Sequence, residues 1–158
     1  MPNTRSSAKA TGGPRDSSEV WSDEERAAMR ESARERKSAA RRSPEDERAD
    51  GEADIQAKIA SMPEPDRAMA ARVHQLVTSA APALMPRTYY GMPAYARDGK
   101  TVCFFKPASK FKERYSTFGF EQAARLDDGA LWPVAFAVIE LNADVEARLV
   151  ALVKKAAG

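Results

Sequence analysis

Apolar residues recur at helical spacing in two segments, one near the middle of the chain and one at its end. The first spans about residues 66–80, where the apolar face consists of Met69, Val73, Leu76, Val77 and Ala80. The second follows Asn142, a good helix-capping residue, and its apolar face consists of Val145, Leu149, Leu152, Val153 and Ala156. The pattern therefore predicts two amphipathic helices, each with one buried stripe.

The segment between these helices has the composition of β-strands. Residues 88–96 and 101–106 are rich in aromatic and β-branched residues, and they flank Asp98-Gly99, a dipeptide typical of hairpin turns. A basic loop is expected over 107–113 and a further strand over 114–120. The nearly continuous apolar run after Pro133 predicts a buried strand. Two helices packed on an antiparallel sheet of about four strands predict an α+β fold, a two-layer sandwich.

The N-terminal part of the chain has a different pattern. Residues 1–21 lack a hydrophobic period and are expected to form a disordered tail. Ser22 and Glu25 have capping-box spacing and open a charged helix over 22–42. An acidic linker over 43–53 is expected to lead into the α+β domain of residues 54–158, which begins with a short helix around Ile55 and Ile59.

The charged helix carries two opposite stripes. Its basic stripe consists of Arg26, Arg30, Arg34, Lys37 and Arg41, and Glu24, Glu31 and Glu35 lie on nearly the opposite side. Its one large apolar residue is Met29, so the helix can bury little surface and is expected to stay outside the core. The basic stripe can contact nucleic acid or an acidic partner. Residues 1–50 hold eleven basic and eleven acidic residues, however, and zero net charge argues against strong phosphate binding.

Composition places the chain among ordinary globular proteins. It has 158 residues, of which 43% are hydrophobic and 30% charged, and its net charge is +2. No run of about 18 apolar residues occurs, so no membrane span is expected. Cys103 is the only cysteine, which excludes an internal disulfide and favours a cytoplasmic protein.

Charge is segregated along the chain. Residues 87–114 hold seven basic and two acidic residues, and residues 121–146 hold six acidic residues and one arginine. Such segregation either steers a charged ligand or marks two solvated faces.

Few residues offer catalytic chemistry. His74 is the sole histidine and lies about 100° from the centre of its helix's apolar face, so we expect it at the surface. Cys103 lies within an expected strand, where apolar burial would raise the pKa of the thiol and leave it inert. The chain has neither a glycine loop of the phosphate-binding type nor a GxSxG motif. The residues therefore predict no catalytic site.

Aromatic and acidic residues are the remaining candidates. Phe104, Phe118 and Phe136 are expected in the core, whereas Tyr89, Tyr90, Tyr95 and Trp132 either fill the core or line a binding groove. Carboxylates are the ligands that hard cations prefer. The candidate metal ligands are Asp50, Glu52 and Asp54 in the linker and the pair Asp127 and Asp128, which otherwise serve as linker and turn residues.

Four motifs in the second half of the chain resemble one family. They are Tyr90-Gly-Met-Pro-Ala-Tyr95, Gly99 with Phe104-Phe-Lys106, Ser116-Thr-Phe-Gly-Phe120, and Leu126-Asp-Asp-Gly-Ala-Leu-Trp-Pro133. In combination they are similar to the YdhG-like family of small bacterial domains, over about residues 52–157. The function of this family is largely unknown, and some members are described as frataxin-like intracellular iron chaperones. The signature positions, which are also the candidate groove, are Tyr89, Tyr90, Gly91, Met92, Pro93, Tyr95, Lys106, Thr117, Phe118, Gly119, Phe120, Trp132 and Pro133.

The resemblance implies a compact sandwich without known catalytic residues and a role in iron delivery. The leading hypothesis is thus a non-enzymatic cytoplasmic binding protein, an iron chaperone that holds iron weakly on surface carboxylates and passes it to a client protein. A second hypothesis is a small-molecule or peptide binding module that uses the aromatic groove. A third is weak nucleic-acid association, with bases stacked on the aromatic strands beside the basic loop. The sequence does not define the oligomeric state.

Overall fold

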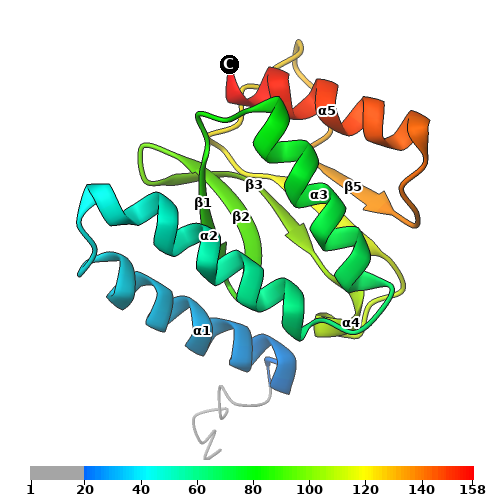
Figure 1. The fold of residues 1–158 in the computed structure, drawn as a ribbon. Helices are drawn as coiled ribbons and strands as arrows, with labels where there is room; N and C mark the ends of the chain where they lie inside the picture. The colour runs from blue at the N-terminus through cyan, green and yellow to red at the C-terminus, as the bar shows by residue number, and fades with distance from the viewer. Residues whose placement is uncertain (1–19) are drawn as a thin grey trace, which may run out of the picture.

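The computed structural model describes residues 20–158, which form five helices and one five-stranded antiparallel sheet (Figure 1). The helices are α1 (Asp23–Ala39), α2 (Pro44–Ser61), α3 (Asp66–Ala80), α4 (Ala108–Phe111) and α5 (Ala143–Ala157). The strands are β1 (Met85–Tyr89), β2 (Met92–Arg97), β3 (Lys100–Lys106), β4 (Ser116–Phe120) and β5 (Ala135–Val138). The predicted α+β fold is confirmed, with one strand more than expected. The tail predicted over residues 1–21 lies almost wholly outside the described residues.

The sheet is a meander in the order β1-β2-β3-β4-β5. Tyr90 and Gly91 join β1 to β2, and Asp98 and Gly99 join β2 to β3. All four residues have positive φ angles, between 50° and 76°, as a two-residue type I′ turn requires. The Asp98-Gly99 turn was predicted. The Tyr90-Gly91 turn was not, and it divides the segment 88–96 that was expected to be one strand.

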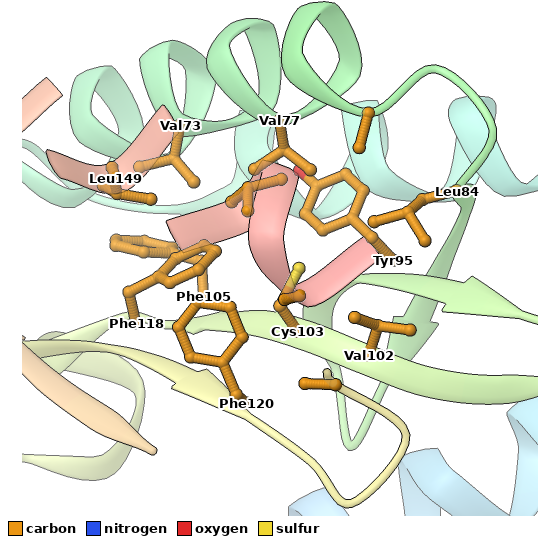
Figure 2. Packing of buried hydrophobic residues seen from close by; sticks show 14 of the residues in the cluster. Val73, Val77, Leu84, Tyr95, Val102, Cys103, Phe105, Phe118, Phe120 and Leu149 are labelled. Carbon is orange, nitrogen blue, oxygen red and sulfur yellow. The ribbon is translucent and has the colours of Figure 1, made fainter. Parts of the chain in front are cut away.

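Helices α2, α3 and α5 cover one face of the sheet (Figure 1). Figure 2 shows Val73 and Val77 of α3 and Leu149 of α5 packed over Phe105 and Phe118 of the sheet, all of them buried. Burial of each such side chain stabilises the fold by about 1.5–3 kcal/mol. The apolar stripes predicted for α3 and α5 are the surfaces that form this core, and Asn142 caps α5 by accepting from the Val145 N–H at 2.9 Å.

The acidic linker predicted over residues 43–53 is wrong, because residues 44–53 form the first half of α2 and Ser43 is its N-cap. One face of α2 packs on the sheet through Gly51, Ile55 and Ile59, and the acidic residues occupy its other faces. A Cβ atom on Gly51 would lie 1.9 Å from the Pro86 carbonyl oxygen. Glycine at this position therefore allows α2 to approach β1 backbone to backbone.

The charged arm is not free of the domain. Helix α1 lies beside α2 and reaches the turn between β1 and β2 (Figure 1). Its buried residues are Ala28 and Ser32, with 4% and 7% exposure, and neither belongs to the main apolar cluster. The arm thus stays outside the hydrophobic core, as expected, yet it is docked onto the domain by other contacts.

Two further expectations are corrected at the far edge of the sheet and in the basic loop. The predicted buried strand after Pro133 is β5, a four-residue edge strand in which Val138 is buried and Ala135 and Ala137 are exposed. Within residues 20–158 no strand pairs with the outer edge of β5, and Ala135 and Ala137 leave one of its faces exposed. The basic loop contains the short helix α4. Among residues 20–158, no helix is long and apolar enough for a membrane crossing.

Candidate functional site

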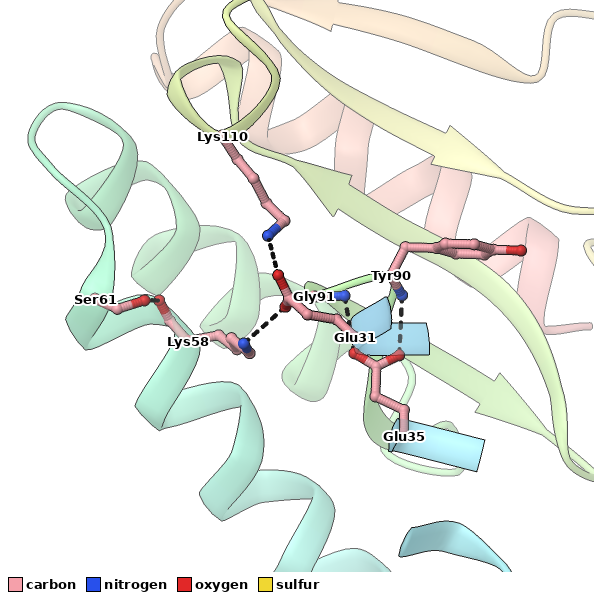
Figure 3. A network of polar contacts seen from close by, with 7 residues as sticks. All are labelled: Glu31, Glu35, Lys58, Ser61, Tyr90, Gly91 and Lys110. Atoms are coloured by element: carbon pink, nitrogen blue, oxygen red, sulfur yellow. Dashed lines mark hydrogen bonds and ion pairs between the residues drawn. The ribbon is translucent and has the colours of Figure 1, made fainter. Parts of the chain in front are cut away.

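A polar network lies where α1 meets the β1–β2 turn (Figure 3). Ser22 caps the N-terminus of helix α1, since its hydroxyl oxygen accepts from the Glu25 N–H at 3.1 Å. From this start, Glu31 and Glu35 fall one helical turn apart on the same side of α1. Both carboxylates point at the domain (Figure 3).

Glu35 binds the backbone of the β1–β2 turn. One of its carboxylate oxygens accepts from the Tyr90 N–H at 3.0 Å and the other from the Gly91 N–H at 2.8 Å. A type I′ turn leaves these two N–H groups without a partner in the sheet, and paired N–H groups of this kind form a concave anion-binding site. The turn therefore carries a carboxylate site made of main-chain atoms.

Glu31 lies between two lysines from different elements. Its oxygens lie 2.8 Å from Lys58 Nζ of α2 and 2.7 Å from Lys110 Nζ of α4. Its side chain is 14% exposed, so water screens these ion pairs only in part. The two ammonium groups thus form a second carboxylate site next to the turn.

Burial and partners shift the pKa of the two glutamates in opposite directions. Burial alone would raise the pKa of Glu31, but the hydrogen bonds and charges of Lys110 and Lys58 outweigh it and hold the pKa below its ordinary value. For Glu35, burial raises the pKa above its ordinary value despite the N–H bonds from Gly91 and Tyr90. The lysine pair is therefore the stronger stabiliser of negative charge.

Gly91 makes the two sites contiguous. A Cβ atom at this position would lie 2.0 Å from Glu31 Oε2 and 2.8 Å from Lys110 Nζ. Its φ of +75° is also one that other residues rarely adopt. A glycine here serves both the turn and the close approach of the carboxylate to Lys110.

A third pair extends the network along α1. Glu24 Oε1 lies 2.7 Å from Lys112 Nζ, just after α4. We call Glu24, Glu31 and Glu35 the acidic stripe. The groups that receive it are called the anion-binding row, which consists of the ammonium groups of Lys112, Lys110 and Lys58 and the N–H groups of Gly91 and Tyr90.

Two clefts adjoin the row. The larger, of about 710 Å³, lies between α1, α2 and β1, and its walls include Tyr89, Tyr90 and the cationic side chains of Arg34 and Arg87. The smaller, of about 350 Å³, lies beside Lys110 and is also lined by Lys58, Met62 and Gly91. Both volumes fall within the range typical of small-ligand sites, about 300–1,000 Å³. Glu31 and Lys58 line both clefts.

The predicted aromatic groove is divided by the structure. Tyr89 and Tyr90 line the larger cleft. Tyr95 instead lies in the core with 1% exposure, and Trp132 packs against the edge of the core. Both are absent from the walls of these two clefts. The prediction of one groove that includes Tyr95 and Trp132 is therefore wrong, because the inward face of β2 carries Tyr95 under α3.

The other signature positions are mostly structural. Met92 and Pro93 are buried in β2, and Lys106 pairs with Glu113 at 2.6 Å. Within β4, Thr117 is half-buried, whereas Phe118, Gly119 and Phe120 are buried. Pro133 is exposed. Gly91 and Tyr90 are thus the signature residues that the structure places in the polar network.

The carboxylates predicted as metal ligands are dispersed. Arg42 lies 3.5 Å from Asp50 and 2.6 Å from Asp54, and Glu52 faces His74. Asp127 and Asp128 are exposed in the segment before β5. Across residues 20–158 the structure shows no group of three histidine, cysteine or acidic side chains arranged to hold a metal ion. The iron hypothesis therefore rests on the family resemblance alone.

His74 and Cys103 are both buried. The prediction that His74 lies at the surface is wrong, since its exposure is 6% and the first half of α2, which was expected to be a linker, covers it with Glu52. Its ring nitrogens lie 2.7 Å from Glu52 Oε1 and 2.9 Å from the Tyr95 hydroxyl. Burial of Cys103 is confirmed, and desolvation raises the pKa of its thiol well above the ordinary value.

No family model matches the chain, and comparisons with curated proteins and with solved structures also found no match. The resemblance to the YdhG-like family thus stays a prediction.

The sequence did not predict the anion-binding row as a site: Tyr90 and Gly91 were expected as family-signature and groove residues, and Lys110 and Lys112 as part of the basic loop. The signal was present in the charges, since the acidic stripe of α1 complements the positive segment over residues 87–114.

Proposed function

We propose that this chain is a cytoplasmic, non-enzymatic binding protein whose ligand carries carboxylates, and that the ligand binds at the anion-binding row. Membership of the YdhG-like family forms part of this proposal. The observation that carries it is the seating of Glu31 and Glu35, one on a lysine pair and one on a pair of main-chain N–H groups. The domain thus has two adjacent positions that already hold a carboxylate.

The chemistry of the row favours carboxylates. Every group in it donates hydrogen bonds, and three of the groups carry positive charge. The two turn N–H groups donate separately to the two oxygens of one carboxylate, in a bidentate arrangement. Hydrogen bonds to an ionised group contribute about 1.5–3 kcal/mol each where they are shielded from water. Donors and fixed charges of this kind serve to hold a ligand.

The test vacates the row and then offers it a soluble carboxylate. In the full chain, Glu24→Gln, Glu31→Gln and Glu35→Gln together remove the three carboxylates of the acidic stripe and leave every group of the row in place. We call this triple substitution the vacated variant. Citrate is titrated into it, and the backbone amide signals of Tyr90 and Gly91 are followed by NMR. We expect saturable shifts of both signals, and weaker shifts in the wild-type chain because α1 occupies the row.

A matched control identifies the site. Adding Lys58→Met and Lys110→Met to the vacated variant removes the ammonium groups and keeps side chains of similar length. Citrate should then bind at least about tenfold more weakly, the factor that corresponds to the loss of one charged hydrogen bond. The proposal fails if citrate produces no saturable shift at Tyr90 and Gly91 in the vacated variant, or if the lysine substitutions leave binding unchanged.

A further inference from the structure

Helix α1 shows how an acidic helix is seated on the row. Glu24, Glu31 and Glu35 are separated by seven and four residues, so they fall on one side of a helix that turns about 100° per residue. Ala28 and Ser32, the buried residues of α1, lie on the same side. Small side chains at these two positions let the helix backbone come close enough for three carboxylates to reach their partners.

Charge, rather than apolar packing, holds α1 on the anion-binding row. Met29 is exposed, and so are Val20 and Trp21 just before the helix, while the two buried residues are small. A helix with so little buried apolar surface is not fixed by the hydrophobic effect. Its charged side chains contact the domain through ion pairs and through hydrogen bonds from N–H groups and the Thr88 side chain, and a competitor with the same charges can replace these contacts. Helix α1 can therefore dissociate from the anion-binding row without exposing the hydrophobic core.

We propose that the anion-binding row is a docking surface for an acidic helix of a partner protein, and that α1 is a tethered competitor for it. The inference rests on the proposed function, since it assigns the class of ligand to that same site. The partner helix carries carboxylates at positions i, i+7 and i+11, as Glu24, Glu31 and Glu35 do, with small residues at i+4 and i+8. Charge complementarity and the seating of α1 define this pattern.

The span of the row favours a helix over a small anion. The residues at i and i+11 of an α-helix are about 16 Å apart along its axis, because the rise is about 1.5 Å per residue. A single small carboxylate can satisfy the turn or the lysine pair, but it cannot also reach Lys112. A rigid helix presents its three carboxylates already spaced, so it loses less conformational entropy on binding than a flexible acidic chain.

Tethering makes α1 an effective competitor. The connection from α1 to α2 is short, running from Ala40 to Ser43, so α1 is always close to the row. A short tether corresponds to an effective concentration on the order of millimolar. A partner must therefore bind more tightly than the isolated contacts of α1 in order to displace it, and any change that weakens α1 raises the apparent affinity for the partner.

The experiment uses the full chain and synthetic peptides. Three peptides are compared by fluorescence anisotropy: the sequence of residues 22–39, the same peptide with glutamine at positions 24, 31 and 35, and a peptide of identical composition in scrambled order. Each is titrated into the vacated variant and into the wild-type chain. Hydrogen exchange of residues 23–39 in both chains reports whether α1 is docked.

We expect the unaltered peptide to bind the vacated variant at least about tenfold more tightly than either altered peptide, the equivalent of one charged hydrogen bond. The wild-type chain should bind it at least about tenfold more weakly than the vacated variant, because α1 competes. Exchange in residues 23–39 should be faster in the vacated variant.

Three results would overturn the inference. If the scrambled peptide binds as well as the unaltered one, the row reads net charge and not a helical pattern, while citrate binding still supports the proposed function. If α1 stays protected in the vacated variant, its carboxylates do not hold it. If sedimentation shows that wild-type chains dimerise through α1 and exclude the peptide, the occupant is a second copy of this chain. Loss of both citrate and peptide binding instead removes the proposed function itself.

Discussion

His74 and Tyr95 are hydrogen bonded inside the core, with Nδ1 of His74 2.9 Å from the Tyr95 hydroxyl oxygen. The other ring nitrogen, Nε2, lies 2.7 Å from Glu52 Oε1. A carboxylate can only accept, so Nε2 donates to Glu52, and in a neutral histidine Nδ1 then accepts from the Tyr95 O–H. The chain Tyr95–His74–Glu52 links the centre of the core to the surface of α2 and satisfies both buried polar side chains.

Substituting Tyr95→Phe tests the structural role of this chain. The phenylalanine retains the buried ring but leaves Nδ1 of His74 without its donor. We expect a loss of about 1–3 kcal/mol in the free energy of unfolding, measured by urea denaturation, because a buried polar atom then lacks a partner. Tyr115→Phe, at an exposed tyrosine, is the matched control and should change stability little. Equal effects of the two substitutions would contradict the role assigned to the Tyr95 hydroxyl.

Cys103 should report global opening of the domain. Cys103 has 0% exposure, so a reagent cannot reach its sulfur in the folded state. Burial also raises the pKa of the thiol, so the reactive thiolate does not form there. We expect a thiol reagent such as dithionitrobenzoate to label the native chain at a rate set by unfolding, and to label the urea-unfolded chain at once. Fast labelling in native buffer would show that β3 opens locally and would contradict the prediction that the Cys103 thiol is unreactive in the folded chain.

The elements that could be predicted from sequence are those defined by local pattern. The apolar stripe of α3 and the Asp98-Gly99 turn depend on neighbours within a few residues, and both were located. The first half of α2 was not predicted as a helix because it is rich in acidic residues and contains Gly51. The role of Gly51 depends on its contact with Pro86 of β1, which the sequence pattern does not show. His74 was misplaced for the same reason, since its burial depends on α2 and not on the periodicity of α3.

The candidate site could not be predicted because it joins four separate segments. The carboxylates of α1 meet lysines of α2 and α4 and the main chain of the β1–β2 turn. Sequence spacing within α1 reveals the acidic stripe but not which side of the helix faces the domain. Backbone N–H groups cannot be recognised from residue types. The one residue of the turn that stood out in the sequence, Gly91, was interpreted as a family-signature residue and not as part of an anion site.

Gly51→Ala should destabilise the fold although it improves helix propensity. Alanine in a helix interior is about 1 kcal/mol better than glycine, but here its Cβ would meet the rigid carbonyl of Pro86. We expect a net loss of about 2 kcal/mol or more in the free energy of unfolding, because α2 must move away from β1. Ala53→Gly, at an exposed position of α2, is the control and should cost about 1 kcal/mol. A stabilising effect of Gly51→Ala would show that α2 and β1 are not in backbone contact.

Docking of α1 should weaken in acid, with a sign that follows from the pKa shifts. The pKa of Glu31 is held below its ordinary value of 4.5, so its contribution is fully present above pH 4.5 and is lost as the pH falls through the lowered pKa. Glu24, bonded to Lys112, is shifted in the same direction. Glu35 is shifted upward, so its contribution is present below pH 4.5 and is lost as the pH rises through the raised pKa.

At neutral pH, therefore, α1 is held mainly through Glu31 and Glu24, and acidification below about pH 4.5 should release it even though protonated Glu35 acts against the release. NMR line widths and amide exchange of residues 23–39, measured between pH 7 and pH 3, check this. The variant Glu31→Gln should show weaker docking at pH 7 and a smaller further loss in acid. Glu35→Gln removes the contribution of protonated Glu35, which opposes release of α1 in acid. This variant should therefore lose more of its α1 docking in acid than the wild-type chain does. Docking that strengthens from pH 5 to pH 3 in the wild-type chain would mean that Glu35, and not the lysine-paired Glu31, dominates the attachment of α1.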